Sequence, residues 1–164
     1  MVILALMALS SCGKKGVNLF VGDYSFKTSG ELAFTMSSGY GGIDLPASLN
    51  VSMSTDIGQL NISASDKKND EVVVVINYFN GDVVVTTGTC NGNTIVLDAY
   101  QRSALPVTVT TLMNTTPSIT VSGTGQMFDD DMIVFDMTYN GSVTLGETTY
   151  RVKDKDIKMV AYRN

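Results

Sequence analysis

The densest group of residues that could do chemistry is the acidic run Asp129-Asp130-Asp131. Three neighbouring carboxylates could bind Ca²⁺ together with loop carbonyl groups, because calcium prefers oxygen ligands. The run lacks the alternating acidic positions and the following glycine of an EF-hand loop. A solvated turn between two strands, whose charges also discourage edge pairing, is the favoured interpretation.

The sequence contains no histidine and no tryptophan. The absence of histidine excludes Ser-His-Asp and Cys-His catalysis and every zinc site with a His ligand. A pair of carboxylates, as in glycosidases, is the catalytic scheme that stays open. The inward faces of the strands predicted below are almost purely apolar, and Asp136 is out of phase with Phe135 and Met137. We therefore predict that the protein is not an enzyme and uses no cofactor.

The charge of the chain argues against a nucleic-acid partner. The formal net charge is −5, and Lys14-Lys15 is the one basic cluster. Nucleic-acid binding requires a basic stripe that neutralises phosphates.

The first twelve residues combine an apolar run, from Val2 to Leu9, with the sequence Leu9-Ser10-Ser11-Cys12. The run has the length of a signal-peptide core and is too short to cross a bilayer as a helix. The four residues resemble the lipobox of bacterial lipoproteins, which implies cleavage before Cys12 and lipid chains on that cysteine. The chain then divides into a signal peptide (1–11), a lipidated cysteine with its tether (12–22) and one domain (23–164).

The resemblance also implies an address, which is the outer membrane, facing the periplasm. Cys12 is not followed by the Asp that retains lipoproteins in the inner membrane. It is also not followed by the acidic residues that are typical of surface-exported lipoproteins. No Lys or Arg precedes Val2, which is compatible with a start upstream of Met1. Acylation of Cys12 would leave Cys90 as a solitary, unreactive thiol, and a Cys12–Cys90 disulfide is the alternative.

The rest of the chain has the alternating pattern of strands. From Tyr24 to Met36, every second residue falls on one largely apolar face. Asn80-Gly81 and Asn91-Gly92 predict type I′ hairpins between strands at roughly 71–79, 82–90 and 93–101. The run Val72–Ile76 is apolar on both faces, which indicates a strand that is covered on both sides or central to its sheet.

A third Asn-Gly pair, Asn140-Gly141, does not predict a hairpin. The apolar residues keep odd positions from Ile133 to Leu145, and a fold at 140–141 would mix the two faces. A turn at Gly146-Glu147 preserves them, with Val143 opposite Tyr150 and Gly141 opposite Val152. We therefore predict one strand over about 131–145, with Gly141 at a bend or close contact, and a final strand over about 148–162.

We predict an all-β fold, an up-and-down antiparallel meander of eight to ten strands that closes into a barrel. A two-sheet sandwich is the alternative, because it gives the same alternation. Glycines at inward positions favour the barrel, since tightly curved sheets need them: Gly30, Gly123, Gly125 and Gly141.

Four features together resemble the calycin-like, lipocalin-like lipoproteins of gut Bacteroidetes, over about residues 22–162. They are the lipobox, the Tyr-x-Phe-x-Thr-x-Gly opening at Tyr24–Gly30, the central Val-rich hairpin with Asn-Gly and the strand motif Ser122-Gly123-Thr124-Gly125. The resemblance implies an eight-stranded barrel. The Gly-x-Trp of typical lipocalins is absent.

The predicted interior is rich in aromatic residues and methionine, and such pliable linings suit small apolar ligands. The candidate lining residues are Tyr24, Phe26, Phe34, Met36, Met53, Phe135, Met137 and Tyr139. A core filled by these same side chains is the alternative, as in many small barrels. Tyr40, in a glycine- and serine-rich loop, could contact a glycan or partner, or close the barrel mouth.

These observations favour a lipid-anchored binding module for a small apolar ligand or an envelope protein. A structural envelope lipoprotein with a filled core is the alternative. A carboxylate-dependent hydrolase is the least favoured function.

Overall fold

The computed structural model of the chain describes residues 16–38, 48–105, 117–145 and 148–164. The expectations for the signal peptide, Cys12 and Tyr40 lie outside these residues. The described part contains a short helix and nine strands. They are α1 (Val17–Phe20), β1 (Gly22–Ser38), β2 (Ser48–Ser52), β3 (Ile57–Ala64), β4 (Glu71–Tyr78), β5 (Val83–Asn91), β6 (Thr94–Arg102), β7 (Pro117–Phe128), β8 (Met132–Leu145) and β9 (Thr148–Arg163).

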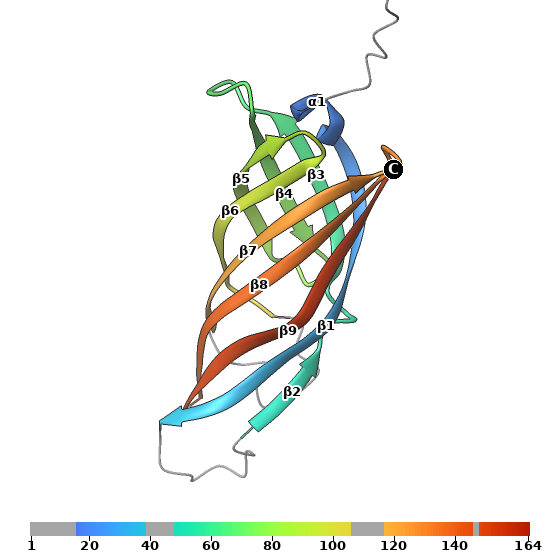
Figure 1. The fold of residues 1–164 in the computed structure, drawn as a ribbon. Coiled ribbons are helices and arrows are strands. Elements are labelled where there is room, and N and C mark those ends of the chain that lie inside the picture. The colour runs from blue at the N-terminus through green and yellow to red at the C-terminus, as the bar shows by residue number, and fades with distance from the viewer. Residues whose placement is uncertain (1–15, 39–47, 106–116, 146–147) are drawn as a thin grey trace, which may run out of the picture.

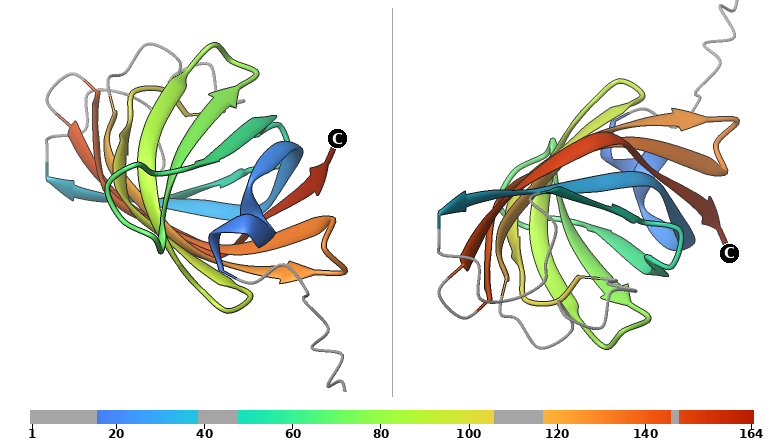
Figure 2. Two further views of the ribbon diagram at one scale, coloured as in Figure 1. Left: turned by 90° about the horizontal axis from the view of Figure 1, so that it is seen from above. Right: turned by 90° about the horizontal axis from the view of Figure 1, so that it is seen from below.

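The strands form one antiparallel meander that closes on itself (Figures 1 and 2). Each strand from β3 to β9 pairs with the next, and β9 pairs with β1 to complete the ring. The edge of β1 that faces away from β9 pairs with β3 along the first part of the strand and with β2 along the later part. The strands β2 and β3 therefore occupy the same position in the strand order of the barrel. The all-β meander is therefore confirmed, and the closed ring of hydrogen bonds excludes the sandwich.

The β8–β9 hairpin has the register that the apolar phase predicts. Gly141 pairs with Val152, and Val143 pairs with Tyr150. β8 continues through Asn140-Gly141 without a turn. A Cβ atom on Gly141 would lie 2.0 Å from the backbone oxygen of Ser118, so the predicted close contact is confirmed.

The curvature of β1 depends on a second inward glycine. At Gly30 the β1–β9 register shifts, and the opposite strand bulges at Asp156, which has a φ of 50°. A Cβ atom on Gly30 would lie 2.6 Å from the Asp156 carbonyl oxygen. The glycine lets the two backbones approach closely at this bulge.

The first two Asn-Gly hairpins exist, but the predicted turn type is wrong. A type I′ turn needs positive φ at both central residues. Only the glycines have it, with φ of 88° at Gly81 and 61° at Gly92. The loops therefore turn with one left-handed residue each, which glycine supplies without a Cβ penalty.

The apolar run in β4 is buried on one face. Val72, Val74 and Ile76 point into the barrel and are fully buried. The outward Val73 and Val75 are only partly buried. Of the two alternatives, the structure supports the second, because β4 is flanked by neighbouring strands in the sheet. The first alternative, that both faces of β4 are covered, is wrong.

The helix α1 lies at one end of the barrel (Figure 1). Its residues Leu19 and Phe20 are part of the hydrophobic core. The backbone oxygen of Phe20 accepts a hydrogen bond of 2.8 Å from the Tyr24 hydroxyl. Arg163, at the end of β9, donates to the backbone oxygens of Leu19 and Val21. These contacts fasten α1 to the first and last strands.

Candidate functional site

A charged cluster lies inside the barrel, formed by Arg102, Asp56 and Asp82. Arg102 is the last residue of β6, Asp56 precedes β3, and Asp82 precedes β5. The Arg102 side chain is 0% exposed, that of Asp56 2% and that of Asp82 7%. Burial of this degree is rare for charged side chains unless they are paired.

A bulge in β6 turns Arg102 into the interior. Strict alternation from Ile95 and Leu97 would point Ala99 and Gln101 inward. Instead the β6–β7 register shifts between Leu97 and Tyr100, and Tyr100 and Arg102 are buried. The extra residue of a bulge reverses the phase of everything that follows it in the strand.

The guanidinium of Arg102 is held on three sides. Its Nη1 donates to both carboxylate oxygens of Asp56, at 2.9 and 3.0 Å. Its Nε lies 3.5 Å from Oδ2 of Asp82. Its Cζ lies 3.5 Å from the centroid of the Tyr78 ring, a cation–π arrangement. These contacts fix the position of the guanidinium.

Hydroxyl groups of other residues in the barrel position the two carboxylates. Thr28 of β1 donates from Oγ1 to Oδ2 of Asp56 at 3.3 Å. Ser103 donates from Oγ to Oδ1 of Asp82 at 2.8 Å. Burial raises the pKa of Asp56, and Arg102 and Thr28 oppose that rise.

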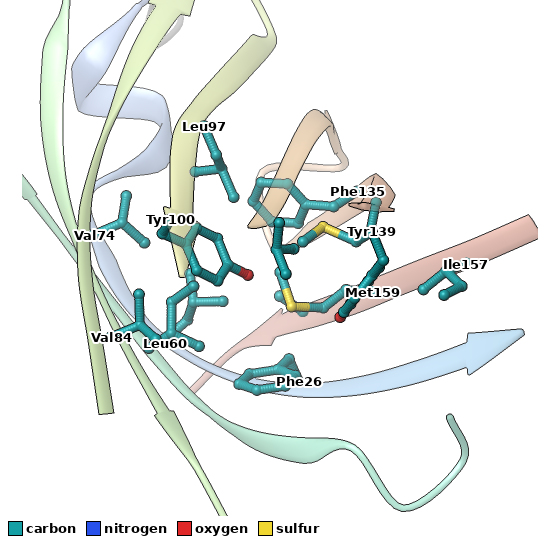
Figure 3. Packing of buried hydrophobic residues seen from close by; sticks show 14 of the residues in the cluster. Phe26, Leu60, Val74, Val84, Leu97, Tyr100, Phe135, Tyr139, Ile157 and Met159 are labelled. Atoms are coloured by element: carbon teal, nitrogen blue, oxygen red, sulfur yellow. The ribbon is translucent and has the colours of Figure 1, made fainter. Parts of the chain in front are cut away.

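Tyrosine side chains form the layer next to the cluster. The hydroxyls of Tyr78 and Tyr100 share a hydrogen bond of 2.9 Å. Phe26 packs edge-on against Tyr78, with ring centroids 5.4 Å apart. Figure 3 shows Phe26, Tyr100 and Tyr139 pointing into the barrel from β1, β6 and β8. Burial raises the pKa of Tyr78 to about 12, and it also raises the pKa values of Tyr100 and Tyr139 well above the ordinary value. All three phenols are therefore neutral at physiological pH.

Three buried polar atoms among the described residues make no hydrogen bond: Nε and Nη2 of Arg102 and the hydroxyl of Tyr150. Asp82 and Tyr139 lie near the guanidinium, but neither gives these nitrogens a hydrogen bond of good geometry. A buried donor without a partner costs about 1–3 kcal/mol. Such groups mark places where a water or ligand supplies the missing acceptor.

The register relates Tyr150 to Arg102 through three successive strand pairings. Arg102 pairs across to Ile119, which pairs with Gly141, which pairs with Val152. Tyr150 is the next inward residue of β9 after Val152. The unpartnered atoms of Arg102 and Tyr150 therefore lie on one inner surface, three strands apart in the sheet.

From this row of paired residues towards the start of β9, the inner surface is mainly apolar, with Thr148 buried among the apolar side chains. The buried side chains of this section, which we call the lower section, come from β1, β2, β7, β8 and β9. They are Phe34, Val51, Ile119, Val143, Thr148, Tyr150 and Val152. Met36 and Leu49 pack against them while partly exposed. Arg102 thus stands between the tyrosine layer and the lower section.

The candidate lining residues lie inside the barrel but at different heights. Tyr24, Phe26, Phe34, Met53, Phe135, Met137 and Tyr139 are all buried, and Met36 is partly buried. Tyr24 lies at the α1 end, Phe26 and Tyr139 lie beside the charged cluster, and Phe34 and Met36 lie in the lower section. The alternation thus finds the inner surface but does not bring these residues together at one point.

The acidic run Asp129-Asp130-Asp131 forms the exposed turn between β7 and β8. The φ angles of Asp129 and Asp130 are positive, at 51° and 59°. No group of three or more acidic, His or Cys residues is arranged to hold a metal ion in the described ranges. Cys90 is buried and free, and burial raises its pKa to about 11, as an unreactive thiol requires.

The expectation of an almost purely apolar interior is wrong. Arg102 is missed because the β6 bulge reverses its phase, and Asp56 and Asp82 are missed because they stand in connections between strands. One signal was present in the sequence. Strict alternation in β6 would expose Tyr100 and bury Gln101, an inversion that indicates a phase change before Tyr100.

Comparison with known proteins adds no family. No family model matches the chain, and no curated protein matches it. Among solved structures, the chain is similar to one described as EF1p2_mFAP2b bound to DFHBI. The TM-score is 0.42 and the identity 13%, over 89% of this chain and 94% of that one.

Proposed function

We propose that this chain is a non-catalytic binding barrel that holds a small, largely apolar molecule next to Arg102. The observation that carries the proposal is the pair of unpartnered N–H groups on a guanidinium whose side chain is 0% exposed. A ligand oxygen that accepts from Nε or Nη2 would remove the cost of burying them. The apolar side chains of the lower section would contact the rest of the molecule.

The arrangement favours binding over catalysis. Two carboxylates do meet inside the barrel, which is the pattern that a glycosidase needs. Both are engaged by Arg102, and each accepts a further hydrogen bond from Thr28 or Ser103. Ion-paired carboxylates of this kind are poor proton donors and poor nucleophiles.

We propose that the barrel is a calycin-like lipoprotein, anchored through Cys12 to the outer membrane and facing the periplasm. The lipobox-like Leu9-Ser10-Ser11-Cys12 supports this address. In the described part of the chain, no helix is long and apolar enough to cross a membrane.

A second candidate is a structural envelope lipoprotein that acts through its outer surface. The observation that favours it is a group of exposed apolar residues at and beside the β4–β5 turn. Phe79 is 85% exposed, and Val83 and Val85 are 59% and 66% exposed. Monomeric proteins usually keep such groups small unless they contact a partner.

Native mass spectrometry of the chain purified from its own host separates these two functions. We expect the Cys12→Ala form, which cannot be acylated, to carry a co-purifying small molecule. The matched variant Tyr150→Phe removes one unpartnered hydroxyl without creating a buried charge, and it should retain less of that molecule. A bare protein mass for the parent form would contradict the binding function and favour the structural one.

Metabolic labelling with a clickable palmitate tests the anchor. We expect the wild-type chain to take up the label and Cys12→Ala to lose it completely, because the thiol is the acylation site. Cys90→Ala is the matched control and should label like the wild type. Undiminished label on Cys12→Ala would rule out the lipoprotein assignment.

A further inference from the structure

We propose that the molecule bound at Arg102 is electrically neutral and presents a carbonyl or similar acceptor oxygen, and that the site rejects both carboxylates and ammonium ions. This inference rests on the proposed function and names the chemical class of its ligand.

The first step is the charge of the cluster. Arg102 contributes +1, and Asp56 and Asp82 contribute −1 each, so the three side chains sum to −1. Among the described residues, Arg102 is the only Lys or Arg that is buried. The two negative charges of Asp56 and Asp82 therefore already exceed the positive charge of Arg102. A ligand carboxylate would add a further negative charge to a buried site that already carries a net one.

The second step concerns the donors and acceptors that are still available. Both oxygens of Asp56 accept hydrogen bonds from Arg102, and one of them also accepts from Thr28. The oxygens of Asp82 accept from the Ser103 hydroxyl and the Ala104 backbone N–H. The atoms without a partner on Arg102 are donors. An ammonium group would thus meet unpaired N–H groups of a fixed cation and carboxylates that already accept hydrogen bonds, which disfavours a cation despite the negative sum.

The third step is the surface around these donors. The guanidinium is covered on one face by the Tyr78 ring, and neutral phenols of Tyr100 and Tyr139 lie nearby. The Tyr150 hydroxyl, on the same inner surface, has no hydrogen-bond partner. Apart from Tyr150 and Thr148, the buried side chains of the lower section are apolar. A neutral, mainly hydrocarbon molecule with one carbonyl oxygen satisfies the donors without adding charge.

The experiment compares three probes of equal length, which are 2-decanone, decanoate and decylamine. Calorimetric titrations use the full chain with Cys12→Ala at pH 7.5. We expect 2-decanone to bind at least about tenfold more tightly than either charged probe. Equal or tighter binding of decanoate or decylamine would overturn this inference and leave the binding function standing. Failure of all three probes to bind would overturn the binding function, and this inference with it.

The matched variant is Asp82→Asn, which makes the cluster neutral and keeps an oxygen to accept from Ser103. We expect the affinity for decanoate relative to that for 2-decanone to rise about tenfold over the parent chain. Thermal unfolding of the variant establishes that it is folded. If this relative affinity does not rise in the folded variant, charge does not set the selectivity and the inference fails.

Discussion

Replacing Arg102 with Met is expected to lower the free energy of unfolding by about 3–5 kcal/mol at pH 7. The reason is that Asp56 and Asp82 would remain buried without their cation. Methionine keeps much of the length and apolar volume of the arginine stem, so the loss reports the missing charge more than a cavity. Urea unfolding followed by circular dichroism measures it. A loss below about 1 kcal/mol would show that the carboxylates do not depend on Arg102.

The triple variant Asp56→Asn, Asp82→Asn, Arg102→Met is the matched control. It removes all three charges, and it should recover most of the stability that the single variant loses, because a buried ion pair contributes little net stability over neutral groups. Asparagine can still accept from Thr28 and Ser103. A triple variant as unstable as Arg102→Met would mean that packing around the arginine stem, and not its charge, holds the cluster together.

The barrel is expected to lose stability steeply between about pH 10 and pH 12. The pKa of Tyr78 is about 12 in the folded chain and near 10 in an unfolded one. A raised folded-state pKa means that the stabilisation is complete below pH 10 and is lost as the pH rises through 12. A shift of this size corresponds to about 3 kcal/mol for Tyr78. Tyr100 and Tyr139 are also raised, so they add to the loss.

The measurement is tyrosinate absorbance together with circular dichroism during an alkaline titration. The buried tyrosines should ionise only as the barrel unfolds, so the two signals should change together. Tyr78→Phe keeps the ring on Arg102 and removes one ionisable group, so its stability should fall less steeply with pH. Tyrosine ionisation that is complete while the barrel stays folded would contradict the burial of this layer.

Much of the wall could be predicted from local pattern. In β1 and β8 the side chains alternate without interruption over long stretches, and burial of one face allows only one register. For that reason the apolar phase alone could assign Val143 to Tyr150 and Gly141 to Val152. Inward glycines also indicated closure, because tight curvature needs close backbone approach.

The candidate site could not be predicted in the same way. Its three charged residues come from a strand end and two connections, at positions 102, 56 and 82. No local pattern links residues so far apart, and each charge is costly to bury unless the other two are present. The three side chains lie together because the barrel places the ends of β4 and β6 and the start of β3 on the same inner surface.

The sequence by itself determined the strands, their inner faces and the glycines at which the wall bends, because each depends on neighbours two residues apart. It also carries the lipobox-like segment that supports the proposed anchor. Only the tertiary structure decided what the barrel contains. A single bulge between Leu97 and Tyr100 reverses the phase of β6 and turns Arg102 from the surface to the interior. A bulge depends on pairing with the neighbouring strand, here β7, and that pairing cannot be predicted from the alternation of β6 alone.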